Sequence, residues 1–261
     1  MRVASIGHGV FAIAMIALGV LGFIKGDFEA VWGGVPANFP GRDVLPYICA
    51  SVALLSGVGL LFQRTAAFAS RFLLVILLLW MLVFKGRFIL AAPLEEGTYQ
   101  SLGENAAIVA AAWVLYAWLA GDQRGFAAGD NGVRIARVLY ALAMIAFGFS
   151  HFVYLNLTAP LVPAWLPAHV GWAYFTGGAY LAAGVAILFD VFARLAAALS
   201  ALQMGLITAL VWIPLVASGQ IGAFQWGEFV MSCVLTASGW VLTDSYRGAR
   251  WFAPRTAAAA G

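Results

Sequence analysis

Long apolar runs divide the chain and are separated by short segments that carry most of its charges. Each run approaches the roughly 20 residues that an α-helix needs to cross a bilayer core. The clearest run is uncharged from Phe72 to Phe84, whereas the run at 104–120 begins with Glu104 and Asn105. The predicted spans are 5–24, 44–62, 66–84, 104–120, 132–153, 170–189, 192–216 and 226–244. This pattern predicts an all-α, polytopic membrane protein with eight transmembrane helices.

The two halves of the pattern repeat each other. Residues 12–19 return at 141–148 with six of eight residues identical, at an offset of 129. Residues 56–62 correspond to 183–189, residues 103–104 to 227–228, and residues 113–115 to 240–242, at offsets of 127, 124 and 127. Four helices per half return the chain to the same side, which predicts parallel four-helix repeats with a pseudo-two-fold axis along the membrane normal. The predicted organisation is a first repeat at 1–120, a cytoplasmic linker at 121–132, a second repeat at 133–246 and a cytoplasmic tail at 247–261.

Composition and charge agree with a membrane protein and orient it. The chain is 64% hydrophobic and 10% charged, far from the roughly 25% charged residues of a soluble domain. Ten arginines fall on the predicted side of the termini and four basic residues on the opposite side, so both termini are expected in the cytoplasm. The net charge of +3 reflects this bias, and no nucleic-acid partner is expected. The lipid bilayer is the expected surrounding.

Two histidines flank a segment rich in proline and tryptophan on the predicted outer side. His151 lies near the outer end of the fifth span, His169 begins the sixth, and Trp165 lies between them. Ionisable residues in spans are functional candidates, so the pair is a candidate to bind a metal, a quinone carbonyl or a proton. Alternatively, His151 hydrogen-bonds a carbonyl of the 154–169 segment and locks it against the bundle, while His169 is solvated. No cysteine or acidic cluster accompanies them, so no metal site is assigned.

Two glutamates occupy corresponding positions in the halves. Glu104 and Glu228 are predicted at the outer starts of the fourth and eighth spans, where a helix N-terminus stabilises negative charge. They either cap these helices or lend acceptors to an outer cavity, with Lys85 or Arg87 opposite Glu104. The candidate ligand-binding residues are His151, Trp165, His169 and Glu228, with Glu104, Lys85 and Arg87 as secondary candidates; no catalytic residue is assigned. Any outer cavity is expected to be lined mainly by helices five to eight.

Cysteine usage excludes one mechanism. Cys49 and Cys233 are the only thiols and neither belongs to a Cys-x-x-Cys, so a dithiol relay is absent. They form either an interhelical disulfide or two small buried residues. The chain carries no haem or flavin motif either.

The second half resembles a known family. Phe147-Gly-Phe-Ser-His-Phe152, Val162-Pro-Ala-Trp-Leu-Pro167 and Tyr174-Phe-Thr-Gly-Gly178 are similar to the motifs of the DoxX-like four-helix membrane proteins. These motifs read Gly-x-x-His-Phe, Val-Pro-Pro-Trp-Leu-Pro and Tyr-x-(Thr/Ser)-Gly. The first half matches only through the repeat, and Gly22 stands at the position of His151.

The resemblance implies a multi-pass protein of the bacterial inner membrane. Family members include the membrane subunit of a thiosulfate:quinone oxidoreductase, which implies a quinone-linked redox subunit with a site under the outer Pro-Trp segment. An extracytoplasmic redox or substrate-bearing protein would then be a partner, and quinone is the one cofactor that the resemblance implies. The alternative is a non-catalytic membrane assembly, transport or trafficking factor, so whether the chain is an enzyme stays open.

Overall fold

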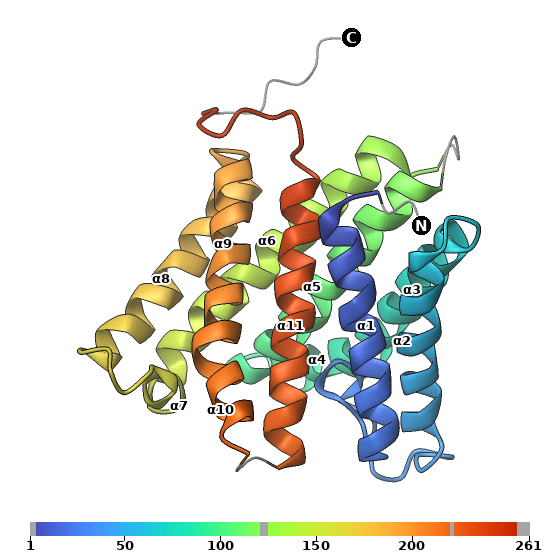
Figure 1. The fold of residues 1–261 in the computed structure, drawn as a ribbon, viewed down its shortest axis with the longest axis horizontal. Helices are drawn as coiled ribbons and strands as arrows, with labels where there is room; N and C mark the ends of the chain where they lie inside the picture. The colour runs from blue at the N-terminus through green and yellow to red at the C-terminus, as the bar shows by residue number, and fades with distance from the viewer. Residues whose placement is uncertain (1–3, 121–124, 220–221, 255–261) are drawn as a thin grey trace.

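The computed structural model describes residues 4–120, 125–219 and 222–254, and all regular structure within them is helical (Figure 1). The α-helices are α1 (Ile6–Lys25), α2 (Leu45–Leu61), α3 (Ala66–Trp80), α4 (Gly86–Ala91), α5 (Glu96–Leu119), α6 (Gly129–Val153), α7 (Leu155–Thr158), α8 (His169–Leu188), α9 (Ala193–Ile207), α10 (Ile213–Ala217) and α11 (Ala223–Asp244). Four short elements join them: the 3-10 turns η1 (Ala30–Trp32) and η3 (Ala159–Leu161), and the π-helical segments η2 (Met81–Lys85) and η4 (Thr208–Trp212).

Six helical stretches among the described residues are long and apolar enough to cross a membrane. They are Ile6–Lys25, Ala66–Ala91, Glu96–Leu119, Gly129–Val153, His169–Leu188 and Ala193–Ala217. The sequence pattern predicts eight, and the two other predicted runs are also helices. However, α2 has 17 residues, at the short edge of what spans a bilayer. Helix α11 is long enough, but polar residues such as Gln225 and Glu228 dilute its apolar character.

Two predicted boundaries are wrong in an informative way. The third span, expected to end at residue 84, continues through η2 to Ala91, because a π-helical segment widens the helix without ending it. The fourth, expected to begin at residue 104, begins two turns earlier at Glu96. Polar residues before the apolar run, including Ser101, are therefore helical. The helix extends beyond what hydropathy alone marks.

Helices α5 and α11 lie in the middle of the bundle and pack against each other. Helix α5 also contacts α3 and α6, whereas α11 contacts α9 and α1. In α5 the run from Ala106 to Ala112 is buried on every side. An all-round apolar helix of small residues is expected where neighbours approach from all directions. The polar residues at the start of α5 are thereby held inside the bundle.

Close helix contacts recur in the two halves. A Cβ atom added to Gly57 of α2 would lie 2.7 Å from the carbonyl oxygen of Ala12 in α1. A Cβ atom on Gly184 of α8 would lie 2.7 Å from the carbonyl oxygen of Ala141 in α6. Both glycines therefore allow backbones to approach more closely than any side chain would permit. The π-helical segments η2 and η4 also occupy corresponding places, each followed by a short α-helix.

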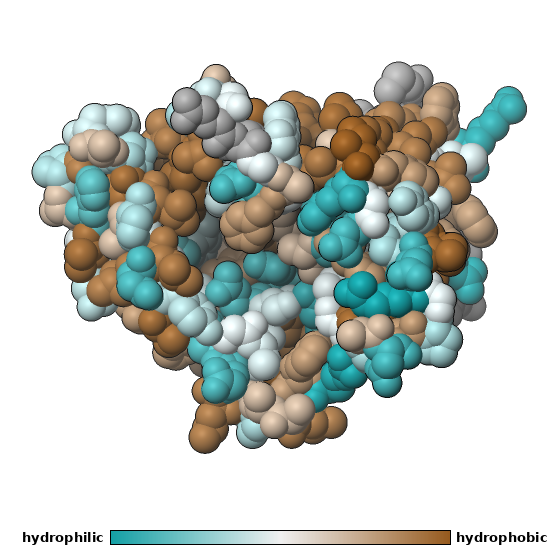
Figure 2. Space-filling view, turned by 90° about the horizontal axis from the view of Figure 1, so that it is seen from below, coloured by the Kyte–Doolittle hydropathy of each residue, from teal (hydrophilic) through white to brown (hydrophobic). Residues whose placement is uncertain are grey.

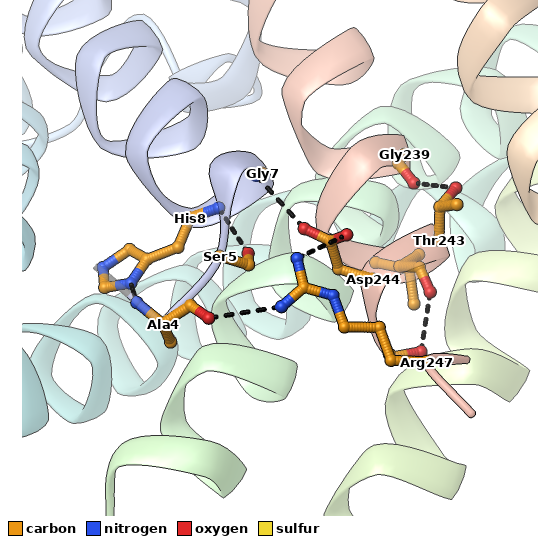
Figure 3. A network of polar contacts seen from close by, with 10 residues as sticks. Ala4, Ser5, Gly7, His8, Gly239, Thr243, Asp244 and Arg247 are labelled. Carbon is orange, nitrogen blue, oxygen red and sulfur yellow. Dashed lines mark hydrogen bonds and ion pairs between the residues drawn. The ribbon is translucent and has the colours of Figure 1, made fainter. Parts of the chain in front are cut away.

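A polar network joins the start of α1 to the end of α11 (Figure 3). The Asp244 carboxylate accepts a 3.1 Å hydrogen bond from the backbone N–H of Gly7, and its other oxygen lies 3.1 Å from Arg247 Nη2. Arg247 also donates to the carbonyl of Ala4, while the N–H of His8 donates to Ser5 Oγ. We call this the termini end of the bundle. The opposite end, where α1 stops at Lys25 and α11 starts, is the loop end.

Candidate functional site

Buried and half-buried charges gather at the loop end. Figure 2, which views the molecule from this end, shows a hollow near the middle with hydrophilic residues in it. Five ionisable side chains, each from a different part of the fold, interact here electrostatically, and we call them the loop-end cluster: Lys25, Glu29, Lys85, Glu104 and Glu228. Such charges are costly at membrane depth and are functional candidates for that reason.

Lys85 is the most deeply enclosed cation of the cluster. It is the last residue of η2, and only 4% of its surface is exposed. Its Nζ atom donates to the carbonyl oxygen of Ala30 at 2.9 Å and to Ser101 Oγ at 2.6 Å. The Glu104 carboxylate interacts electrostatically with this ammonium group. Lys85 therefore ties η1 to α5 through groups that replace its hydration shell.

Glu29 reaches into the bundle from the loop that follows α1. Its residue surface is 3% exposed, and Oε2 lies 3.6 Å from Lys25 Nζ. Its other oxygen, Oε1, is buried and has no hydrogen-bond partner among the described residues. A Cβ atom on Gly227 of α11 would lie 3.0 Å from Oε2, so glycine there makes room for the carboxyl group. Burial raises the pKa of Glu29 above its usual range; Lys25 opposes this shift and Asp27 adds to it.

Glu104 and Glu228 come from the two central helices and interact with each other across the bundle. Both are half-buried. Neither lies at a helix start as the sequence predicts, because α5 begins eight residues before Glu104 and α11 five residues before Glu228. The helix dipole acts mainly within the first turn, so capping does not account for their positions. Gln100 hydrogen-bonds the Glu104 side chain. Lys25 is the cation that interacts electrostatically with Glu228.

Two neutral polar groups beside the cluster also lack partners within the described chain. Asn105 is fully buried; its Nδ2 donates to the carbonyl of Val31 at 3.0 Å, but its Oδ1 accepts nothing. The indole Nε1 of Trp32 is likewise unpaired. Buried polar groups in proteins are usually hydrogen-bonded, so such groups call for an explanation. Glu29 Oε1 and Asn105 Oδ1 are both free to accept hydrogen bonds.

An apolar groove of about 230 Å³ is lined by residues of α2, α3 and η2 and by Trp32 of η1. Trp32, Trp80 and Phe84 form one part of its wall, and Cys49 is also exposed to it. Cys49 and Cys233 are both free thiols, so the interhelical disulfide that the sequence left open is not formed. The turn η1 therefore contributes to both places, since Trp32 lines the groove and the carbonyl of Ala30 accepts from Lys85.

The remaining candidate residues lie outside the cluster. Arg87 is exposed, donates to the carbonyl of Gly34 at 2.7 Å and lies over the Phe88 ring. Trp165 is 70% exposed, and His169 begins α8 half-buried. Of the four primary candidates, Glu228 alone belongs to the loop-end cluster.

His151 has a structural partner within its own helix. Its Nδ1 atom lies 2.8 Å from the carbonyl oxygen of Phe147, and its ring lies 5.5 Å from that of Tyr180. The alternative that His151 bonds a carbonyl of the 154–169 segment is therefore wrong about the partner. Its Cβ atom packs against Gly177 of α8. This histidine holds α6 against α8, and its role in binding stays a prediction.

Sequence reasoning missed several contributors to the site. Lys25, Glu29, Ser101 and Asn105 carried no functional prediction. For Lys25 and Glu29 the sequence does hold a signal: the segment 25–43 contains Trp32, Pro36 and Pro40, and such content is typical of chain that lies at the membrane interface or re-enters a bundle. Comparisons of the chain with protein-family models, curated proteins and solved structures find no match.

Proposed function

We propose that this chain is an eight-span membrane protein of the transport class, which binds a small organic cation at its loop-end cluster. The observation that carries the proposal is the buried, unpartnered Oε1 of Glu29 among charges that do not balance. Three carboxylates face two ammonium groups in the cluster. A site at membrane depth favours neutrality, since an uncompensated charge there is expensive.

An organic cation suits these groups better than a bare metal ion. Within the described ranges, no three His, Cys, Asp or Glu side chains converge as metal coordination requires. Ammonium and guanidinium ligands instead supply several N–H donors over a wider space. Glu29 Oε1 and Asn105 Oδ1 are acceptors for such donors, and the carboxylates of Glu104 and Glu228 supply the charge.

Two four-helix repeats underlie the proposed architecture. The support is the recurrence of the same contacts at the sequence offsets: Gly57 meets Ala12 as Gly184 meets Ala141. Helices α2 and α11 would then cross the membrane with the six more apolar stretches. A short helix and a helix with polar residues are tolerated where neighbouring helices, not lipid, surround them.

The loop end is proposed to face the outside of a bacterial inner membrane, with both termini in the cytoplasm. Arg137 donates to the carbonyl of Ser245, and Arg194 donates to that of Ala249 at 2.6 Å, so both lie at the termini end with Arg247. Arginine enrichment at one end is the mark of the cytoplasmic face. A cation would accordingly enter from outside.

The quinone-linked redox function and DoxX-like membership remain a proposal based on the resemblance of residues 147–188 alone. That resemblance centres on His151, whose ring contacts are internal to α6 and α8. The charged cluster draws four of its five members from the first half of the chain. We therefore favour the transport class over the redox class.

Calorimetry on protein in lipid nanodiscs tests the cation site. Methylammonium and guanidinium, which both carry N–H donors, are the probes, and acetate is the anionic control. We expect the cations to bind and acetate not to bind. Glu228→Gln should weaken cation binding at least about tenfold, because a charged partner contributes about 1.5–3 kcal/mol. The exposed Glu95→Gln is the matched control and should bind as the wild type does. Absence of cation binding to the wild type would overturn the proposal.

A further inference from the structure

Glu29 and Glu228 present two carboxyl groups to one ammonium group. Lys25 Nζ lies 3.6 Å from Glu29 Oε2, and the same ammonium group interacts electrostatically with Glu228. The two carboxyl groups also repel each other when ionised. Two nearby carboxylates that share one compensating charge retain a proton between them more readily than either would alone.

The proton belongs on Glu29 for a geometric reason. Glu29 is almost fully buried, whereas Glu228 is half-buried and better solvated. The Oε1 atom of Glu29 receives no hydrogen bond from any described group, so no donor among them stabilises a full negative charge on that oxygen. Burial also raises the pKa of Glu29, which agrees with a proton held on this carboxyl group.

The other charges around Glu29 do not remove this imbalance. The charged and titratable groups on the surrounding elements are Lys25 of α1, Asp27 and Arg42 of the loop, Lys85 of η2, Glu104 of α5 and Glu228 of α11. Arg42 lies over the Phe28 ring, and Lys85 is engaged by Ser101 and Ala30. Among the described residues, Lys25 is the one cation that forms an ion pair with Glu29.

We propose that Glu29 is the proton-carrying group of the cation site, protonated when the site is empty and deprotonated when a cation binds. This inference rests on the proposed function. On binding, the O–H bond of Glu29 breaks, the proton passes to water on the loop-end side, and the carboxylate accepts an N–H donor or the charge of the cation. The net charge of the cluster is then unchanged, so exchange of one cation for one proton costs little electrostatically.

Infrared spectroscopy of the empty protein tests the resting state without any ligand. Near neutral pH, we expect a C=O stretching band of a protonated carboxyl group that disappears in Glu29→Gln and persists in Glu95→Gln. A wild-type spectrum without a Glu29-dependent band would overturn the inference, whether or not a cation binds. If Glu29→Gln does not fold, Glu29→Asp should shift the band, since it keeps the acid and changes its surroundings.

Calorimetry tests the exchange and needs no variant. Methylammonium binding to the wild type, measured in two buffers with different heats of ionisation, gives the number of protons released. We expect about one proton per cation, and cation affinity that rises with pH. Binding without proton release would overturn the exchange and leave the proposed cation site standing. Absence of binding together with a Glu29-dependent band would overturn the cation site but keep the proton on Glu29.

Discussion

Lys85 Nζ lies 2.6 Å from Ser101 Oγ, a contact that joins the π-helical segment η2 to the polar first turns of α5. The same ammonium group holds the carbonyl of Ala30, so one side chain connects three segments. Lysine is strongly hydrated, and these protein oxygens replace its water. The arrangement orients η1, and with it Glu29, toward α11.

Replacement of Lys85 should therefore destabilise the protein strongly. Lys85→Met removes the cation that interacts with Glu104 and the donor to Ala30 and Ser101, and each hydrogen bond from a charged group contributes about 1.5–3 kcal/mol of unfolding free energy. Arg87→Met is the control: it removes an exposed cation from the same stretch and should cost less than about 1 kcal/mol. Steric trapping in bicelles measures both. The double variant Lys85→Met/Glu104→Gln should recover part of the loss, and strict additivity would argue against the pair.

Glu29 should make stability depend on pH. Its pKa is raised in the folded protein by burial, so folding favours the protonated form. Its contribution to stability is complete below the unfolded pKa and is lost as pH rises through the folded pKa. The thermal midpoint of Glu29→Gln relative to the wild type should consequently increase with pH. A difference that does not change with pH would show that Glu29 ionises freely.

The sequence predicted part of this site because Glu104 and Glu228 occupy corresponding places in the repeat. One of the two predicted roles was that both lend acceptors to an outer cavity; that α5 and α11 bring the two side chains within electrostatic reach of each other was not predicted. The position of Glu104 well inside its helix was not predictable. The apolar run begins at residue 104, whereas the helix α5 begins at Glu96. The polar residues that follow the first turn have partners outside the helix: Lys85 donates to Ser101, and Asn105 donates to the carbonyl of Val31 in η1.

Lys25 and Glu29 could not be predicted as site residues from local pattern. A charged loop between spans is normally solvated, whereas tertiary contacts of η1 with α5 and α11 bury this one. The emphasis on the second half had a similar origin. Its histidine and Pro-Trp segment are prominent in sequence, yet His151 satisfies Nδ1 at Phe147, within its own helix.

His151→Ala should reduce stability more than His169→Ala. The His151 ring packs against Tyr180 and bonds a carbonyl, and loss of such a buried hydrogen bond costs about 1–3 kcal/mol. His169 forms no comparable contact among the described residues, and its replacement should change the thermal midpoint little. If His151→Ala is fully stable but lacks a measurable ligand interaction, His151 is a binding residue. If neither stability nor binding changes, it has no special role.

Reporter fusions test the membrane topology. A fusion after Gly261 and one within 120–133 should both report a cytoplasmic location, because the arginines at the termini end follow the positive-inside bias. Parts of both insertion points lie outside the described residues. A fusion between Asp27 and Asp43 should report the opposite side. A periplasmic signal after Gly261 or within the linker would contradict the eight-span arrangement.

The glycine contacts test the proposed repeat. Gly57→Ala and Gly184→Ala each drive a methyl group to within 2.7 Å of a carbonyl oxygen in the neighbouring helix. The helices must separate, and overpacking of this kind costs about 1–3 kcal/mol. Equivalent packing predicts similar losses at the two positions, measured as thermal midpoints in nanodiscs.

Gly178→Ala is the matched control, because a Cβ atom there meets nothing within 4 Å. This variant should be at least as stable as the wild type, since alanine favours helix formation over glycine by about 1 kcal/mol. A large loss of thermal stability at Gly57 with none at Gly184 would mean that the two helix pairs contribute differently to stability. The halves would then share an outline without sharing their energetics, and the duplicated architecture would lose its main physical support.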